Sequence, residues 1–189
     1  TPTVPPDSKD PMQAAFDAVG AGKYRTALGV LDAALRTHPG DDTLLWVKGR
    51  LHQEIGEAAQ AVEALTVILQ RHPSAHVFTL RGLAYRQLCR FRDEMADYDR
   101  AVGLDPQFAQ AYFERGFTKM YYQKGNDPAP EFTKVIELEP QNWLAYYLRG
   151  HSNGYWFNKL PKAMADYRRV VELKPDFARA YCDMAFALS

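Results

Sequence analysis

The stretch that decides the fold runs from Ala96 to Gly116 and reads ADYDRAVGLDPQFAQAYFERG. A fixed period near 34 residues indicates stacked helix–turn–helix units, each of which buries its apolar face only against its neighbours. The proline of this stretch belongs to such a series, with intervals of 34, 33, 34 and 35 residues: Pro39, Pro73, Pro106, Pro140 and Pro175. We therefore predict an all-α helix–turn–helix solenoid rather than a globule around one compact core.

Two further columns of residues keep step with the prolines. The first helix of each unit carries a small residue, which lets two helices approach closely and outweighs the helix penalty of glycine, about 1 kcal/mol. This column reads Ala15, Gly49, Gly82, Gly116, Gly150 and Ala185. In the second helix, a spacing of four places a small and a large residue on one face. These pairs are Ala27 with Leu31, Ala61 with Leu65, and Ala163 with Tyr167.

These columns resemble the tetratricopeptide repeat family, whose consensus is close to the runs that end at Pro106 and Gly116. The resemblance covers about residues 8–189 and implies a right-handed superhelix in which the first helices line a concave groove. The array (10–189) would hold repeats at about 8–41, 42–74, 75–108, 109–142 and 143–177, then a final helix at 177–188. Residues 1–9 are expected to form a flexible, proline-rich segment. Pentatricopeptide repeats are the weaker alternative because they usually lack this register of proline and glycine.

Two units depart from the pattern. In the fourth unit Pro128 stands where the small packing residue belongs, so we expect a short second helix with Asp127 as its cap. The fifth unit carries one extra residue near positions 155–160. Drift in a tolerant loop explains both departures, and a reshaped groove is the alternative.

Three arginines recur with the repeat, and each has an acid sixteen or seventeen residues further on: Arg81 with Asp97, Arg115 with Glu131, and Arg149 with Asp166. The first two units lack both members of the pair. This joint occurrence predicts ion pairs within each unit of modest stabilising effect. A basic ladder for an acidic ligand is the alternative.

Two expectations concern side chains that would be buried. Glu94 stands in the small-residue column of the third unit, so it should tilt outward or pair with Arg81 or Arg115, because an unpaired buried carboxylate is costly. Cys89 and Cys182 lie about three units apart, too far for a disulfide, and we expect lone buried thiols.

The resemblance implies that a ligand contacts a few first-helix positions in each unit. Aromatic side chains of this density on a concave face are typical anchors for a peptide or an amphipathic helix. Phe113 and Phe117 have packing within the solenoid as an equal alternative, whereas Tyr147, His151 and Trp46 are expected to be exposed. The candidate groove residues are Trp46, Arg50, Arg86, Phe113, Phe117, Tyr121, Tyr147, His151 and Tyr155. No three consecutive first helices carry the Lys, Asn and Arg set with which family members hold a C-terminal carboxylate.

Several function classes find little support in the sequence. A formal net charge of zero argues against nucleic acid, and no apolar run approaches the roughly 20 residues of a membrane span. The five histidines lack the spacing of a helical zinc pair, and no phosphate-binding glycine loop or nucleophile elbow is present. We therefore expect no catalytic residue, no metal and no cofactor.

We predict a non-catalytic scaffold that binds a peptide or helix of a partner protein in a groove centred on the fourth and fifth units. The alternative is a regulatory or oligomerisation region of a larger protein, which could be an enzyme. The final helix is apolar on nearly every side, so we expect either that the natural chain continues or that another subunit covers this end. In the second case the chain would self-associate through Tyr181, Met184, Phe186 and Leu188. For location we favour the cytoplasm, with a fragment of an exported protein or lipoprotein as the alternative.

Overall fold

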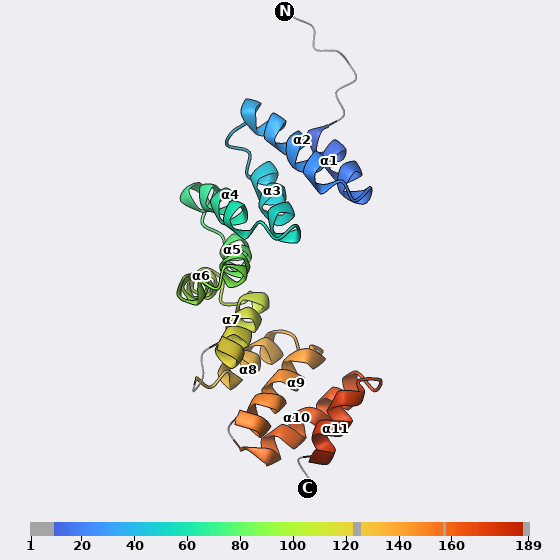
Figure 1. Cartoon of the computed structure of the whole chain (residues 1–189). Coiled ribbons are helices and arrows are strands. Elements are labelled where there is room, and N and C mark those ends of the chain that lie inside the picture. Colours follow the sequence, from blue (N-terminus) through green and yellow to red (C-terminus); the bar gives the residue numbers. More distant parts are fainter. Residues whose placement is uncertain (1–9, 123–125, 157, 187–189) are drawn as a thin grey trace, which may run out of the picture. The chain divides into compact units, whose positions relative to one another are not determined.

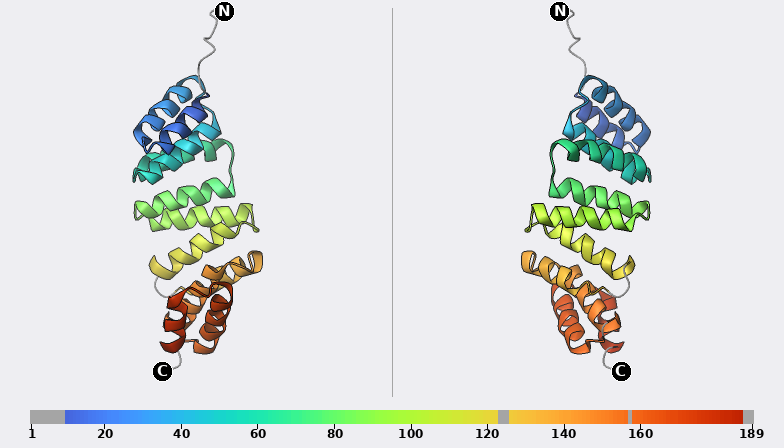
Figure 2. Two further views of the ribbon diagram at one scale, coloured as in Figure 1. Left: turned by 90° about the vertical axis from the view of Figure 1, so that its right-hand side faces the viewer. Right: turned by 90° about the vertical axis from the view of Figure 1, so that its left-hand side faces the viewer.

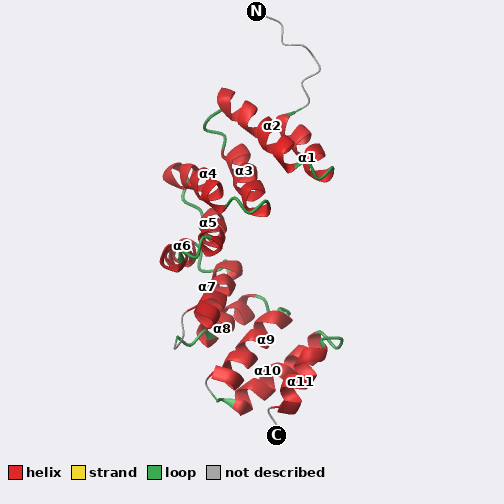
Figure 3. Ribbon diagram, in the orientation of Figure 1, coloured by secondary structure: helices red, strands yellow, loops and turns green. Residues whose placement is uncertain are grey.

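The computed structural model describes residues 10–122, 126–156 and 158–186, and the regular structure in those ranges is entirely helical (Figures 1 and 3). The chain divides into two compact units, residues 1–94 and 95–189, and each is considered by itself. The expected flexible segment 1–9 lies outside the described residues, as does Leu188.

The first unit contains α1 (Pro11–Gly20), α2 (Tyr24–Thr37), α3 (Asp42–Glu54), α4 (Ala58–Arg71), α5 (Ala75–Gln87) and the start of α6 (Phe91–Leu104). The second contains the rest of α6, α7 (Ala109–Tyr122), α8 (Ala129–Leu138), α9 (Trp143–His151), the π-helix η1 (Ser152–Trp156), α10 (Leu160–Leu173) and α11 (Ala178–Phe186). Within the described residues, five helix pairs followed by a single helix confirm the predicted fold class.

Each proline of the period follows a second helix at a fixed distance. The helices α2, α4, α6, α8 and α10 all end two residues before a proline. The residue that precedes a proline is driven out of the helical region by steric contact with the ring, which explains this common end point. Among the first helices that follow, α3 begins from a side-chain cap: the Asp41 carboxylate accepts from the amides of Thr43 (2.9 Å) and Leu44 (3.1 Å), whereas Ser74 makes no such bond before α5.

Within each compact unit, successive helices pack side by side (Figure 2). The glycine column faces the second helix of its own pair. A Cβ placed on Gly49 would lie 3.0 Å from the Leu65 side chain, and one on Gly150 would lie 2.9 Å from Tyr167 Cε1. Both contacts are closer than ordinary packing, so the close helix approach inferred from the sequence is confirmed at these positions.

The two irregular repeats, the fourth and the fifth, depart from the regular helix pair in different ways. As predicted, the second helix of the fourth repeat is short: α8 has 10 residues where α10 has 14. The N-cap position is Pro128 rather than the predicted Asp127, although the Asp127 carboxylate accepts from the Ala129 amide at 2.9 Å. In the fifth repeat α9 continues into the π-helix η1, whose wider turn takes up one additional residue. The chain then turns through Asn158, which has a φ of 49°.

The predicted ion pairs are confirmed in two of the three repeats that carry them. Arg115 Nη2 lies 2.8 Å from Glu131 Oε2, and Arg149 Nη2 lies 2.7 Å from Asp166 Oδ1. Both carboxylates are buried, so each guanidinium also compensates a charge removed from water. The third pair, Arg81 with Asp97, belongs to one repeat, but its residues fall in different compact units, and it stays a prediction.

Two expectations about buried side chains need correction. Glu94 is fully buried and does pair with a basic side chain. A partner within its own compact unit is Arg86, whose Nε lies 2.7 Å from Glu94 Oε1. Arg86, eight residues before Glu94, was not one of the two candidates, Arg81 and Arg115. The expectation of buried thiols is wrong, since Cys89 and Cys182 are both exposed. Cys89 lies in the turn before α6, and Cys182 lies on an exposed face of α11.

Candidate functional site

A hollow opens at an equivalent place in each of the two compact units, between the first helices of two successive repeats. In the first unit it lies between α3 and α5 and has a volume of about 360 Å³; in the second it lies between α7 and α9 and has about 230 Å³. Five lining positions correspond at a spacing of two repeats, 67 residues: Asp42 with Ala109, Thr43 with Gln110, Trp46 with Phe113, His72 with Glu139, and Val77 with Leu144. The aromatic side chain of each hollow, Trp46 or Phe113, is a predicted groove residue.

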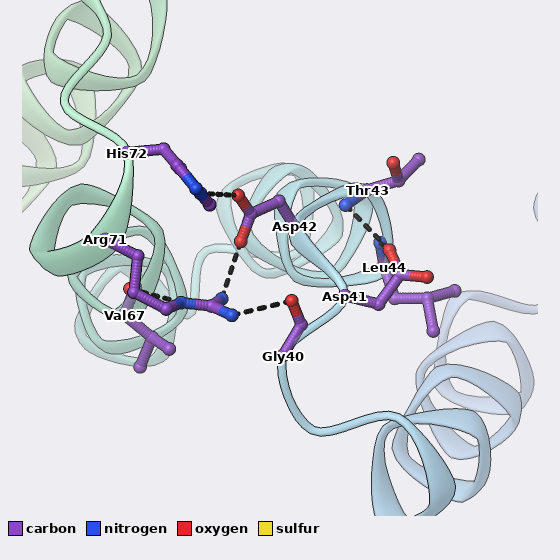
Figure 4. A network of polar contacts seen from close by, with 8 residues as sticks. All are labelled: Gly40, Asp41, Asp42, Thr43, Leu44, Val67, Arg71 and His72. Carbon is purple, nitrogen blue, oxygen red and sulfur yellow. Dashed lines mark hydrogen bonds and ion pairs between the residues drawn. The ribbon is translucent and has the colours of Figure 1, made fainter.

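The rim of the first hollow is built by a polar network around Asp42 (Figure 4). The Asp42 carboxylate lies 2.5 Å from Arg71 Nη2 and 2.6 Å from His72 Nδ1, while Arg71 Nη1 donates to the carbonyl of Gly40 at 2.6 Å. The end of α4 is thereby held against the first turn of α3. Asp42 and His72 thus belong to the polar part of the wall, and Trp46, Ile68 and Val77 form its apolar part.

In the second unit, a row of rings runs from α9 to α11. The ring of His151 stacks on Tyr155 with centroids 4.6 Å apart, and Tyr155 stacks on Phe186 at 5.5 Å with the ring planes 2° from parallel. Tyr155 is 50% exposed and Phe186 is 65% exposed. This end of the row therefore offers an aromatic surface to a ligand.

The other end of the row is fixed by a buried carboxylate on α11. Asp183 accepts hydrogen bonds from the hydroxyls of Tyr147 (2.9 Å) and Tyr155 (3.2 Å). Burial, followed by the hydrogen bond and charge of Asp183, raises the pKa of Tyr147 to about 12. Burial also lowers the pKa of His151, whose Nδ1 is buried with no hydrogen-bond partner in the described part of the chain. Tyr147, Tyr155 and His151 therefore gather around the single carboxylate of Asp183.

The remaining predicted site residues are in mixed surroundings. Tyr121 is 48% exposed and its ring lies 4.6 Å from that of Phe117, which is half-buried. Arg50 is exposed and lies 3.5 Å from Glu54, whereas Arg86 is half-buried beside Glu94.

Tyr147, Trp46 and His151 were expected to be exposed. That expectation is wrong for Tyr147, which is 8% exposed because Asp183 and the ring of Phe177, 4.9 Å away, cover it. Trp46 and His151 are half-buried. Asp183 was missed, because nothing in the repeat spacing marks an acid on the final helix as a partner of Tyr147.

Two kinds of site are not found among the described residues. They contain no group of three or more His, Cys, Asp or Glu side chains arranged to hold a metal ion. None of the helices in the same ranges is long and apolar enough to span a membrane.

Comparison with known proteins identifies the repeat. A model of the tetratricopeptide repeat matches residues 18–84. No curated protein sequence matches the chain significantly. Among solved structures, MamA is 19% identical with a TM-score of 0.78, and the match covers 91% of this chain and 99% of MamA.

Two other solved structures are similar. A tetratricopeptide repeat protein from Parabacteroides merdae is 19% identical with a TM-score of 0.79, covering 94% of this chain and 70% of its own. YrrB, described as a TPR protein with an unusual peptide-binding site, is 20% identical with a TM-score of 0.71, covering 88% and 86%. At these identities the likeness shows the fold.

Proposed function

Because this chain carries tetratricopeptide repeats, we propose that it is a non-catalytic scaffold that binds a peptide or helix of a partner protein along its first helices. The observation that carries this proposal is the hollow that recurs beside Trp46 and Phe113 at the same place in the repeat. In each compact unit, taken by itself, a hollow with an aromatic side chain between two first helices suits a side chain of a bound peptide.

The exposed aromatic side chains supply the expected anchors. Tyr121, Tyr155 and Phe186 are each about half-exposed or more, and each ring is held by contact with another ring, as with Phe117 and Tyr121. Rings ordered before binding lose little conformational freedom when a ligand packs on them. YrrB, a protein of similar fold, is itself described as having a peptide-binding site, which makes the same ligand class reasonable here.

The proposal is tested by selecting ligands from a display library of random peptides on the whole chain. The affinity of the strongest peptide is then measured for the wild type, Tyr121→Ser and Tyr122→Ser. The two tyrosines are neighbours in α7 with 48% and 46% exposure, but only Tyr121 is a predicted groove residue. Tyr122→Ser therefore controls for the loss of an exposed ring.

We expect Tyr121→Ser to weaken binding about tenfold or more, as loss of an anchoring aromatic side chain does at other interfaces, with little change for Tyr122→Ser. Equal affinities for all three proteins, or a failure of the library to yield any peptide, would argue against a peptide-binding groove.

A second use, self-association, is favoured by the exposed side chains of α11. Tyr181 is 48% exposed and Phe186 is 65% exposed, whereas Met184 on the same helix is half-buried. Contact between copies would remove this apolar surface from water. Light scattering over a range of concentrations should show a species larger than the monomer, and Tyr181→Lys should reduce it. A monomer at every concentration would exclude this use of α11.

A further inference from the structure

A third hollow, of about 650 Å³, lies among the second helices α8 and α10 of the second unit and shares no lining residue with the groove hollows. Both irregularities of the repeat meet there. Asp127 and Pro130 come from the shortened start of α8, while Asn153 comes from the π-helix and Lys159 from the turn that follows it. The hollow is therefore a product of the two departures from the repeat rather than of the repeat itself.

The acids that line this hollow each have a basic partner. Lys159 Nζ lies 3.0 Å from Asp127, Lys134 Nζ lies 3.2 Å from Glu137, and Arg149 makes its two contacts with Asp166. Lys162, which also lines the hollow, is exposed and has no ion-pair partner in the described ranges. One positive charge thus remains available to a ligand.

The wall of the hollow also contains an amide without an internal partner. Asn153 is only 3% exposed, and its backbone carbonyl accepts from the Lys159 amide at 2.6 Å. Asn153 lines the hollow, and its carboxamide makes no hydrogen bond to any described residue. The carboxamide atoms are not among the side-chain polar atoms that are sealed from solvent without a partner, so a ligand in the hollow can reach them and replace water.

The chemistry of these two residues defines the ligand. A carboxamide offers a donor and an acceptor side by side, which matches the C=O and N–H groups of an extended peptide main chain. The ammonium of Lys162 complements a carboxylate. A volume of about 650 Å³ lies within the range of ligand pockets, roughly 300–1,000 Å³.

We propose that this hollow is a second binding site, separate from the groove, for an extended peptide segment that carries an acidic side chain. Asn153 contacts the main chain of the segment and Lys162 contacts its carboxylate. The guanidinium of Arg149 forms part of the wall but does not receive the carboxylate, since Asp166 and Thr133 Oγ1 (2.9 Å) already bind it.

The test is a nuclear magnetic resonance titration of the isotope-labelled whole chain with two blocked peptides, acetyl-Ala-Ala-Glu-Ala-Ala-amide and its Gln counterpart. With the Glu peptide we expect the side-chain amide signal of Asn153 to shift, with a dissociation constant of about 1 mM. The Gln peptide should bind about threefold more weakly because it lacks the charge.

Variants separate the proposed site from general attraction of acidic peptides. Lys162→Gln should weaken the Glu peptide about threefold, and Asn153→Asp, which preserves the shape of the side chain, should weaken it about tenfold or more. Arg168→Gln is the control, because Arg168 is exposed on the same helix but does not line the hollow. Circular dichroism checks that each variant is folded. No shift at Asn153, equal binding of both peptides, or an equal effect of Arg168→Gln would overturn the proposal.

Discussion

The substitution of glycine by alanine should have opposite effects at two helical positions of this chain. In α9, a Cβ on Gly150 would lie 2.9 Å from Tyr167 Cε1 and 3.1 Å from Asp166 Cβ. Tyr167 is 1% exposed, so its ring cannot move aside into solvent. Overpacking of this kind costs about 1–3 kcal/mol, and the better helix propensity of alanine offsets about 1 kcal/mol of it. We expect Gly150→Ala to lower the free energy of unfolding by about 1 kcal/mol.

Gly29, in the interior of α2, supplies the matched comparison. A Cβ there would meet no atom within 4 Å, so Gly29→Ala should raise the free energy of unfolding by about 1 kcal/mol. Urea unfolding followed by circular dichroism measures both variants against the wild type. If Gly150→Ala were stabilising to the same extent as Gly29→Ala, the close approach of α9 and α10 would not explain the glycine column.

Three further substitutions test other features. Cys89, with a φ of 56°, occupies the turn position that Gly56 fills at 78°, so Cys89→Gly should raise the free energy of unfolding by about 0.5–1 kcal/mol relative to Cys89→Ala; equal stabilities would contradict backbone strain. The buried Tyr167 hydroxyl has no hydrogen-bond partner in the described part of the chain, so Tyr167→Phe should be neutral or stabilising by up to about 1 kcal/mol, and a loss of stability would reveal a missing partner. Because the pKa of Tyr147 is raised from 10 to about 12, its stabilising effect is present below pH 10 and is lost as pH rises through about 12. Tyr147→Phe should flatten that decline in an alkaline unfolding series, and an unchanged decline would be evidence against the assignment.

Much of the fold could be predicted because it depends on a few repeated requirements. A proline that ends a helix and a glycine that admits a neighbouring helix act locally, so their period alone located the helix pairs. The ion pairs of Arg115 and Arg149 were predictable for a related reason: each joins the two helices of one unit, and that spacing is constant along the chain.

The side chains that were misjudged depend on contacts outside the repeat spacing. Tyr147 is buried because Asp183, on the following first helix, covers it and accepts a hydrogen bond from its hydroxyl group. Glu94 is paired across a tight turn with Arg86. Cys89 is exposed because it occupies a turn position where the first two repeats carry Gly22 and Gly56.

The candidate sites were predictable to different extents. Trp46 and Phe113 occupy the same place in the repeat, so the groove hollows follow from the register. The hollow beside Asn153 does not, because it forms where a shortened helix meets a π-helix. The sequence showed both irregularities, but only the folded chain brings Asp127 and Lys159 to 3.0 Å.

The central claim is that a peptide binds along the first helices, and photocrosslinking locates a bound peptide most directly. A photoreactive phenylalanine analogue replaces Tyr155, which is 50% exposed at the end of the aromatic row, or Tyr122, which is 46% exposed outside it. With a peptide selected on the whole chain, we predict crosslinking from position 155 and little from position 122. Crosslinking from position 122 with none from position 155 would contradict the proposed groove.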